Sequence, residues 1–123
     1  MVSISSGWAG YAAPDLDVAQ AFYTGLGITV ERDDEMAMLS LKLTADVSIY
    51  LKPDHVPATF TVLNLLVDDL EAAVDGAVAA GATFERYEGF EQDERGIARG
   101  PVGPAIAWTT DPAGNVVAFI ESS

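Results

Sequence analysis

The chain has 123 residues, half of them hydrophobic, and its 19 acidic and 6 basic side chains give a formal net charge of −13. This composition excludes a disordered chain, the charge argues against binding to nucleic acid or anionic lipid, and the absence of cysteine excludes disulfides and thiolate metal sites. No apolar run is long enough to span a membrane and no signal-peptide pattern occurs, so we expect a cytoplasmic protein. The length fits one domain, or two small modules that share a core.

The first half of the chain predicts a strand, a helix and three strands. The apolar run GWAGYAA, residues 7–13, precedes Asp15, a residue type that caps helices. An amphipathic segment ending at Gly27 follows, and its apolar residues Leu16, Ala19, Phe22, Tyr23 and Leu26 share one helix face. Three extended segments come next: ITVER (28–32), MAMLSLKL (36–43) and VSIYLK (47–52).

The second half repeats this order after PDHVPAT, residues 53–59, whose two prolines indicate a linker. The run FTVLNLLV (60–67) leads to Asp69 as a helix cap, and Gly81 ends a helix with Leu70, Ala73, Val74 and Ala77 on one face. Three further strands are expected at ATFERYEGF (82–90), IAWTT (106–110) and VVAFIE (116–121). The last two form a hairpin, because DPAGN between them has Pro112 and Gly114 at positions suited to a tight turn.

An internal repeat links the two halves. With a constant offset of 54, PDLDVAQAFYTGLGITVER (14–32) aligns with DDLEAAVDGAVAAGATFER (68–86) without a gap and with seven identical positions. The sequence therefore predicts an α+β fold of tandem βαβββ units. The first unit covers residues 1–52, the linker residues 53–59 and the second unit residues 60–123.

This duplication, the helix openings at Pro14–Leu16 and Asp68–Leu70, the run FYTGLGITV and the final DPAGNVV hairpin resemble the vicinal-oxygen-chelate superfamily of glyoxalase, bleomycin-resistance and extradiol-dioxygenase proteins. The resemblance covers nearly the whole chain and is nearest to the metal-free bleomycin-resistance branch. It implies two curved sheets that close around a concave ligand site. It also implies a homodimer, since units from two subunits often cooperate in this family, and since exposed sheet edges and apolar faces are costly.

Metal-dependent members of the superfamily carry a His, Gln or Glu ligand on the first and last strand of each unit. The resemblance places these positions at Trp8, Ile49, Val62 and Ala118, and none of these side chains can bind a divalent ion. The only histidine, His55, lies in the linker, where it is typical of a surface loop. We therefore expect no metal, no cofactor and no catalytic residue of the usual family kind.

The residues expected around the cavity are mostly apolar and aromatic. If the family's ligand positions point inward, the site is lined by Trp8, Ile49, Val62, Asn64 and Ala118, with Met38, Tyr50 and Trp108 as further wall residues. Tryptophan offers a flat stacking surface and an N–H donor. The alternative is that Trp8 and Trp108 merely fill the core. Asn64, expected on a buried face, needs a hydrogen-bond partner from the protein, water or a ligand.

The segment EGFEQDERGIARGPVGP, residues 88–104, resembles a loop and edge strand that can cover the cavity mouth in this superfamily. Its charged residues are candidate acids or bases for a reaction in the cavity, and the alternative is that they only keep a surface loop solvated. These residues are Glu91, Asp93, Glu94, Arg95 and Arg99. The resemblance implies a metal-independent protein that gives antibiotic resistance by sequestering a planar or aromatic small molecule, apolar or cationic. The alternatives are a cofactor-independent isomerase, cyclase or lyase of the same fold, and a structural or regulatory dimer.

Overall fold

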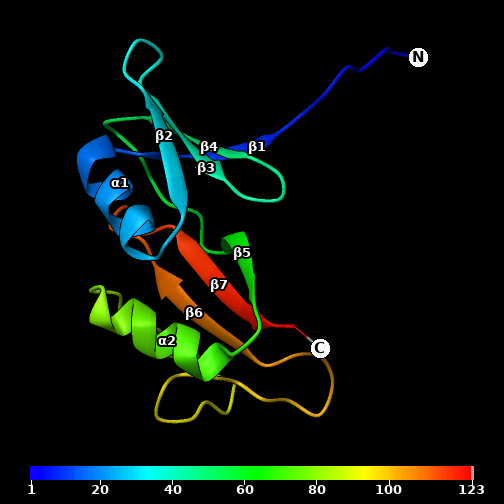
Figure 1. The fold of residues 1–123 in the computed structure, drawn as a ribbon. Coiled ribbons are helices and arrows are strands. Elements are labelled where there is room, and N and C mark those ends of the chain that lie inside the picture. The colour runs from blue at the N-terminus through cyan, green and yellow to red at the C-terminus, as the bar shows by residue number, and fades with distance from the viewer. Residues whose placement is uncertain (123) are drawn as a thin grey trace. The chain divides into compact units, whose positions relative to one another are not determined.

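A computed structural model describes residues 1–122 of the chain. The chain divides into two compact units, Met1–His55 and a second unit that begins at Val56. Within the described residues there are two helices and seven strands, and the strands form one four-stranded and one three-stranded sheet (Figure 1). This confirms the predicted α+β class. Neither helix is long and apolar enough to cross a membrane in the part of the chain described.

The first unit has the predicted order of one strand, one helix and three strands. Its elements are β1 (Ala9–Ala13), α1 (Leu16–Gly25), β2 (Thr29–Asp33), β3 (Met38–Lys42) and β4 (Val47–Leu51). The strands form sheet A in the order β1-β4-β3-β2. β1 runs parallel to β4, whereas β3 is antiparallel to both of its neighbours.

Helix α1 begins and ends at the residues that the sequence indicates. The carboxylate of Asp15 accepts hydrogen bonds from the backbone N–H groups of Asp17 and Val18 at 2.9 and 3.2 Å. Gly27, just beyond the helix, has a φ of 94°, a conformation that glycine adopts without steric cost. The helix packs on β2 and β3 and buries Leu16, Ala19 and Tyr23. One face of sheet A is therefore the core of this unit.

The second unit follows the same plan with one strand fewer. Its elements are β5 (Thr61–Val67), α2 (Leu70–Ala79), β6 (Ile106–Thr110) and β7 (Val116–Glu121), and the strands form sheet B in the order β5-β7-β6. Asp69 caps α2 and Gly81 follows it with a φ of 107°. The predicted β6–β7 turn is held by Asp111, whose carboxylate accepts from the backbone N–H groups of Ala113 and Asn115, both at 2.9 Å.

The strand expected at residues 82–90 is the main error in the predicted fold. Only Phe84 pairs with β6, through an isolated bridge to Thr109, and the chain then leaves the sheet. The glycines at 89 and 96 have φ values of 89° and 85°, which are incompatible with a continuous strand. The amide of Gln92 replaces strand pairing here, because it donates to the backbone carbonyls of Glu85 and Gly96.

Candidate functional site

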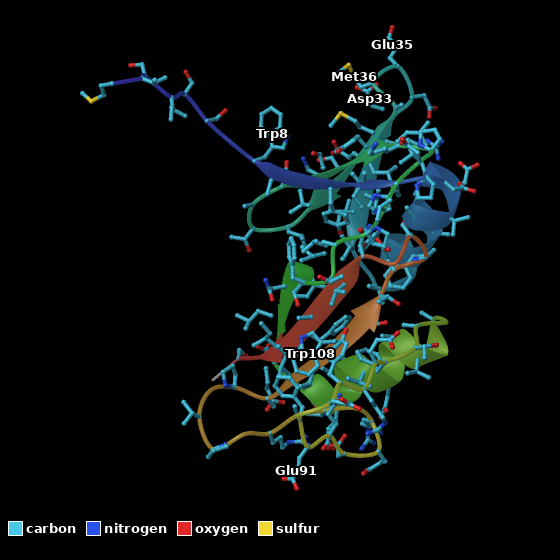
Figure 2. The ribbon with its side chains drawn as sticks, turned by 180° about the vertical axis from the view of Figure 1, so that it is seen from behind. Trp8, Asp33, Glu35, Met36, Glu91 and Trp108 are labelled. Atoms are coloured by element: carbon cyan, nitrogen blue, oxygen red, sulfur yellow. The ribbon has the colours of Figure 1, made fainter. Side chains whose placement is uncertain are left out.

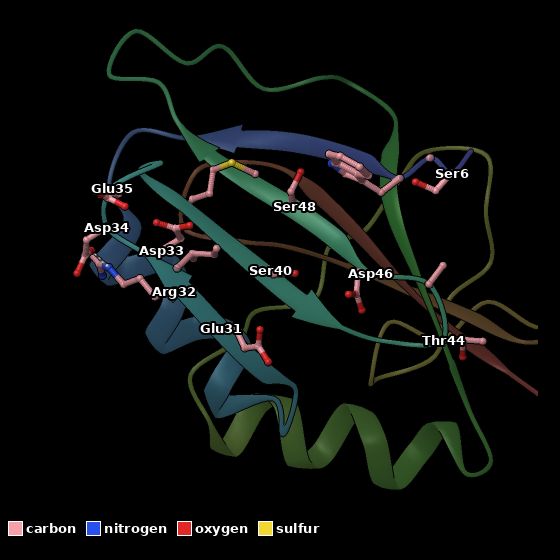
Figure 3. Close-up of a pocket in the computed structure, with 15 residues that line it drawn as sticks. Ser6, Glu31, Arg32, Asp33, Asp34, Glu35, Ser40, Thr44, Asp46 and Ser48 are labelled. Carbon is pink, nitrogen blue, oxygen red and sulfur yellow. Dashed lines mark hydrogen bonds and ion pairs between the residues drawn. The ribbon is translucent and has the colours of Figure 1, made fainter. Parts of the chain in front are cut away.

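The two faces of sheet A have opposite characters. On the α1 face, Tyr11, Ile49 and Leu39 lie side by side in the strand register and are buried. On the other face the aligned residues are small or polar: Gly10, Ser48, Ser40 and Glu31. A groove of about 950 Å³ runs over this second face (Figure 3). Its lining comes from sheet A, the segment before β1 and the two hairpin turns.

The floor of the groove is flat because its central residues are small. A Cβ atom added to Gly10 would lie 2.5 Å from Ser48 Oγ and 2.8 Å from the backbone oxygen of Ser48, so no larger residue fits there without displacing the strand next to it. Trp8 stands at one end of the groove, immediately before β1, and is 71% exposed (Figure 2). Glu31 and Asp33 lie on β2, at the opposite edge of sheet A from β1. Three inter-strand steps separate β1 from β2, which is about 14 Å at the usual spacing between strands. An aromatic surface and a carboxylate pair thus face the same space.

The groove is strongly acidic. Five carboxylates line it, from Glu31, Asp33, Asp34, Glu35 and Asp46, against the single guanidinium of Arg32. That guanidinium is already engaged, since it donates to Asp34 at 2.7 Å and to Asp17 at 2.6 Å. Hydrogen bonding to Asp34, then to Asp17, raises the pKa of Arg32, so it stays charged.

The carboxylates differ in how far they are neutralised. Lys42 hydrogen-bonds Asp46 at 2.5 Å, which raises the lysine pKa, and lies 3.9 Å from Glu31. Asp33 accepts only the backbone N–H of Met36, at 3.1 Å, and no basic side chain among residues 1–122 pairs with Asp33 or Glu35. The β2 end of the groove therefore has uncompensated negative charge (Figure 3).

The predicted site residues of the first unit fall on both faces of sheet A. Trp8 and Met38 line the groove, and Tyr50 lies on the same face beyond the lining, 46% exposed. Because Trp8 is exposed, the alternative that it fills the core does not hold. Ile49 is fully buried on the opposite face, against Tyr11 and Leu39, so it belongs to the core rather than to the groove.

In the second unit, three predicted site residues form one row across sheet B. Asn64, Ala118 and Trp108 are direct neighbours in the register of β5, β7 and β6. Asn64 is exposed, which corrects the expectation of a buried amide, and Ala118 is fully buried. Val62 lies at a register shift between Thr61 and Leu63 and is half-buried.

Trp108 belongs to an aromatic cluster that the sequence does not indicate. Its ring centroid lies 5.3 Å from that of Tyr87 and 5.0 Å from that of Phe90, in edge-on and tilted arrangements. Burial, and then the charge of Glu85, raise the pKa of Tyr87. Since Tyr87 and Phe90 come from the segment after α2, this segment covers part of the Trp108 ring.

The charged residues of the 88–104 segment mainly hold that segment on α2. Arg95 pairs with Asp75 at 2.9 Å, and Arg99 pairs with Asp93 at 2.6 Å. Partial burial by itself would raise the pKa of Asp93. The pKa is nevertheless lowered, because the carboxylate accepts hydrogen bonds from the backbone N–H of Ile97, the guanidinium of Arg99 and the backbone N–H of Arg95. Glu94 lies near Arg95, at 3.6 Å, while Glu91 is exposed at the edge of the unit (Figure 2).

Among residues 1–122, no group of three or more histidine or carboxylate side chains is arranged to hold a metal ion. His55, in the linker, is half-buried. Sequence reasoning predicted only Trp8 and Met38 among the groove residues, and those that it missed include Glu31, Asp33, Ser40 and Ser48. Strand alternation in TVERD could have placed Glu31 and Asp33 together on one face.

No protein-family model matches the sequence, and no curated protein matches it either. Solved structures do match. A bleomycin resistance determinant encoded on transposon Tn5 superposes with a TM-score of 0.72 at 19% identity, covering 98% of this chain and 99% of its own. A bleomycin-binding protein complexed with bleomycin gives a TM-score of 0.66 at 22% identity, with 98% and 100% covered.

A glyoxalase/bleomycin resistance protein from Catenulispora acidiphila gives a TM-score of 0.64 at 24% identity, covering 94% of this chain and 96% of its own. At these identities the likeness establishes the fold, and it agrees with the duplication and the final hairpin. The chain has the glyoxalase/bleomycin resistance fold, the fold of the vicinal-oxygen-chelate superfamily.

Proposed function

We propose that this protein is a metal-independent binding protein that captures a planar, cationic small molecule, and that capture of an antibiotic is its biological role. The observation that carries the proposal is the groove of sheet A, with the exposed indole of Trp8 at one end and, at the other, an acidic cluster in which Asp33 and Glu35 have no basic partner among residues 1–122. A flat ring stacks on the indole while a positive group approaches Glu31 and Asp33.

The size and composition of the groove support a small-molecule ligand. Its volume of about 950 Å³ lies in the range of sites that hold drug-sized molecules. The floor offers two hydroxyls, Ser40 and Ser48, which donate or accept hydrogen bonds. A net charge of −13 also attracts cations to the surface from a distance. Two of the matched proteins are described as bleomycin-binding or bleomycin-resistance proteins, which makes an antibiotic a reasonable first candidate.

Capture is favoured over turnover because, in the part of the chain described, no hydroxyl of the groove is hydrogen-bonded to a base that could activate it as a nucleophile. None of its lining residues is a histidine, lysine or tyrosine, the side chains that most often act as catalytic bases besides carboxylates. Among the hydrogen bonds of residues 1–122, none joins a groove serine to a carboxylate. A cofactor-independent isomerase, cyclase or lyase is the second candidate, favoured only by the carboxylates that could move a proton. Recovery of unchanged ligand from the complex separates the two functions.

The proposal includes a homodimer in the cytoplasm. All residues that line the groove belong to the first unit, so a ligand lying on sheet A contacts protein on one side. Another protein surface is needed to cover its outer side. In a chain with exposed sheet faces, a second copy is the simplest source of such a surface.

The test is isothermal titration at pH 7 with two ligands of similar shape and different charge, 9-aminoacridine, which is a cation at this pH, and acridine, which is mostly neutral. Bleomycin is the third ligand. We expect saturable binding of at least one of the cationic ligands, weaker binding of acridine, and ligand recovered unchanged. Absence of binding by both cations would reject the proposal, and chemically altered ligand would favour the enzyme.

Paired variants locate the charge. Glu31→Gln and Asp33→Asn together should weaken cation binding about tenfold or more and leave acridine binding unchanged. Glu71→Gln with Asp75→Asn is the control, because it removes the same two charges from α2, where both carboxylates pair with arginines and neither lines the groove. Equal loss in the control would show that the effect comes from overall charge and not from the groove.

A further inference from the structure

Lys42, the last residue of β3, lies beside the groove and close to two of its carboxylates. Its ammonium hydrogen-bonds Asp46 at 2.5 Å and lies 3.9 Å from Glu31. Both of these carboxylates line the groove, Asp46 from the turn before β4 and Glu31 from β2 (Figure 3). The side chain of Lys42 is 36% exposed, so most of its surface is covered by the protein. Lys42 is therefore a built-in counter-ion of the groove.

The carboxylate that Lys42 neutralises lies at the Trp8 end of the groove. β1 and β4 run parallel with Ala9 opposite Val47. The residues that precede these two, Trp8 and Asp46, are therefore at the same end of sheet A, on strands about 5 Å apart. Without Lys42, a bare carboxylate would stand beside the indole.

The carboxylates without a basic partner lie at the opposite end. Asp33 is opposite Met38 in the strand register, and Met38 precedes Lys42 by four residues, which is about 13 Å of extended strand. Glu35 lies beyond Asp33, in the turn between β2 and β3. Neither carboxylate pairs with a basic side chain among residues 1–122. The groove is thus compensated beside Trp8 and negative at the hairpin turn.

We propose that Lys42 sets the charge specificity of the groove: it occupies the cation position beside Asp46, so that a positive group of the ligand is directed to Asp33. The ammonium of Lys42 repels a second cation near Asp46 and cancels the charge that would attract one. A flat ring on Trp8 therefore meets a compensated pair, and the positive group of the ligand lies across the sheet. This inference rests on the cation binding of the proposed function.

Titration of single variants with 9-aminoacridine and bleomycin tests the role of Lys42. Lys42→Gln should strengthen binding of the cation that the wild type binds at least about fourfold, because it frees Asp46, and should leave binding of the mostly neutral acridine unchanged. Lys42→Arg keeps the charge and should behave like the wild type. Lys52→Gln is the matched control, because it removes the same charge from the same unit, while its partner Asp54, at 2.9 Å, does not line the groove. This control should change affinity by less than about twofold, since salt screens a distant charge.

Combined variants test where the cation binds. Lys42→Gln with Asp46→Asn removes the pair as a whole and should return the affinity to within about threefold of the wild type. In the Lys42→Gln background, Glu31→Gln with Asp33→Asn should weaken cation binding by less than about threefold, because Asp46 then attracts the cation. In the wild-type background the same two changes should cost about tenfold or more.

Three results would overturn the inference while the wild type still binds the cation and the proposed function stands. The first is a gain from Lys42→Gln no larger than that from Lys52→Gln, which would be an effect of net charge. The second is a gain that persists when Asp46→Asn is added. The third is an equal loss from the β2 variants in both backgrounds. Absence of binding of both cations by the wild type would overturn the inference and the proposed function together.

Discussion

Replacement of Trp8 by alanine should weaken ligand binding much more than it weakens folding. Trp8 is 71% exposed, so the remaining 100 − 71 = 29% of its surface is what folding buries. A fully buried aromatic side chain covers about 150 to 250 Å², and 29% of this is about 45 to 75 Å². At about 25 cal/mol per Å² the truncation costs roughly 1 to 2 kcal/mol of stability. A core tryptophan would cost about 3 to 5 kcal/mol.

The loss of affinity is expected to be at least about tenfold. Aromatic stacking contributes roughly 0.5 to 1.5 kcal/mol beyond area burial, and the contact area lost from the ligand adds to it. Urea unfolding measures the first quantity and titration with 9-aminoacridine or bleomycin the second. Trp8→Phe is the control, because it keeps a ring and should recover part of the affinity. A destabilisation above 3 kcal/mol with unchanged affinity of the folded fraction would refute the reasoning.

Three other predictions address the core, the metal and the 88–104 segment. Ile49→Ala should destabilise the fold by about 2 to 5 kcal/mol in urea unfolding and leave ligand affinity unchanged, because Ile49 is fully buried on the α1 face. A reduced affinity of the folded fraction would show that Ile49 belongs to the ligand site. The purified protein should contain no stoichiometric divalent ion by elemental analysis, and EDTA should not alter binding; one ion per chain lost together with binding would contradict this. The folded pKa of Asp93 is lowered, so its charge stabilises the protein above its unfolded pKa and this stabilisation is lost as the pH falls through the folded value. Asp93→Asn should therefore lose less stability than the wild type on acidification below about pH 4, measured by urea unfolding at each pH, and identical pH profiles would show that Asp93 carries no such linkage.

The fold could be predicted from the sequence because the repeat constrains it twice. An offset of 54 relates Asp15 to Asp69 and Gly27 to Gly81, and all four act as helix boundaries in the structure. The last strand of each unit lies outside the gapless repeat, and there the family resemblance, which treats Ile49 as the equivalent of Ala118, is one residue out. Gly10 and Asn64 are related by the offset, and their partners across the sheet are Ser48 and Ala118. The position equivalent to Ala118 is therefore Ser48, not Ile49.

A shift of one residue moves a side chain to the other face of a strand, which is why Ile49 was predicted in the site and lies in the core. The acidic end of the groove was missed for a different reason. Charged residues in an exposed strand look like an ordinary solvated surface until the strand order places them opposite Trp8. The contacts of Tyr87 and Phe90 with Trp108 depend on the irregular path after α2, and no local pattern predicts that path.

The most direct test of the central claim is a ¹H–¹⁵N NMR titration with 9-aminoacridine, read at the indole N–H of Trp8 and the backbone amides of Ser40 and Ser48. The account predicts that these three signals shift together and saturate with one dissociation constant, and that the amides of α2, which lie outside the groove, do not shift. The Glu31→Gln and Asp33→Asn double variant should require about tenfold more ligand for the same shifts. Saturable binding that leaves the Trp8, Ser40 and Ser48 signals unmoved would contradict a ligand site in the groove of sheet A.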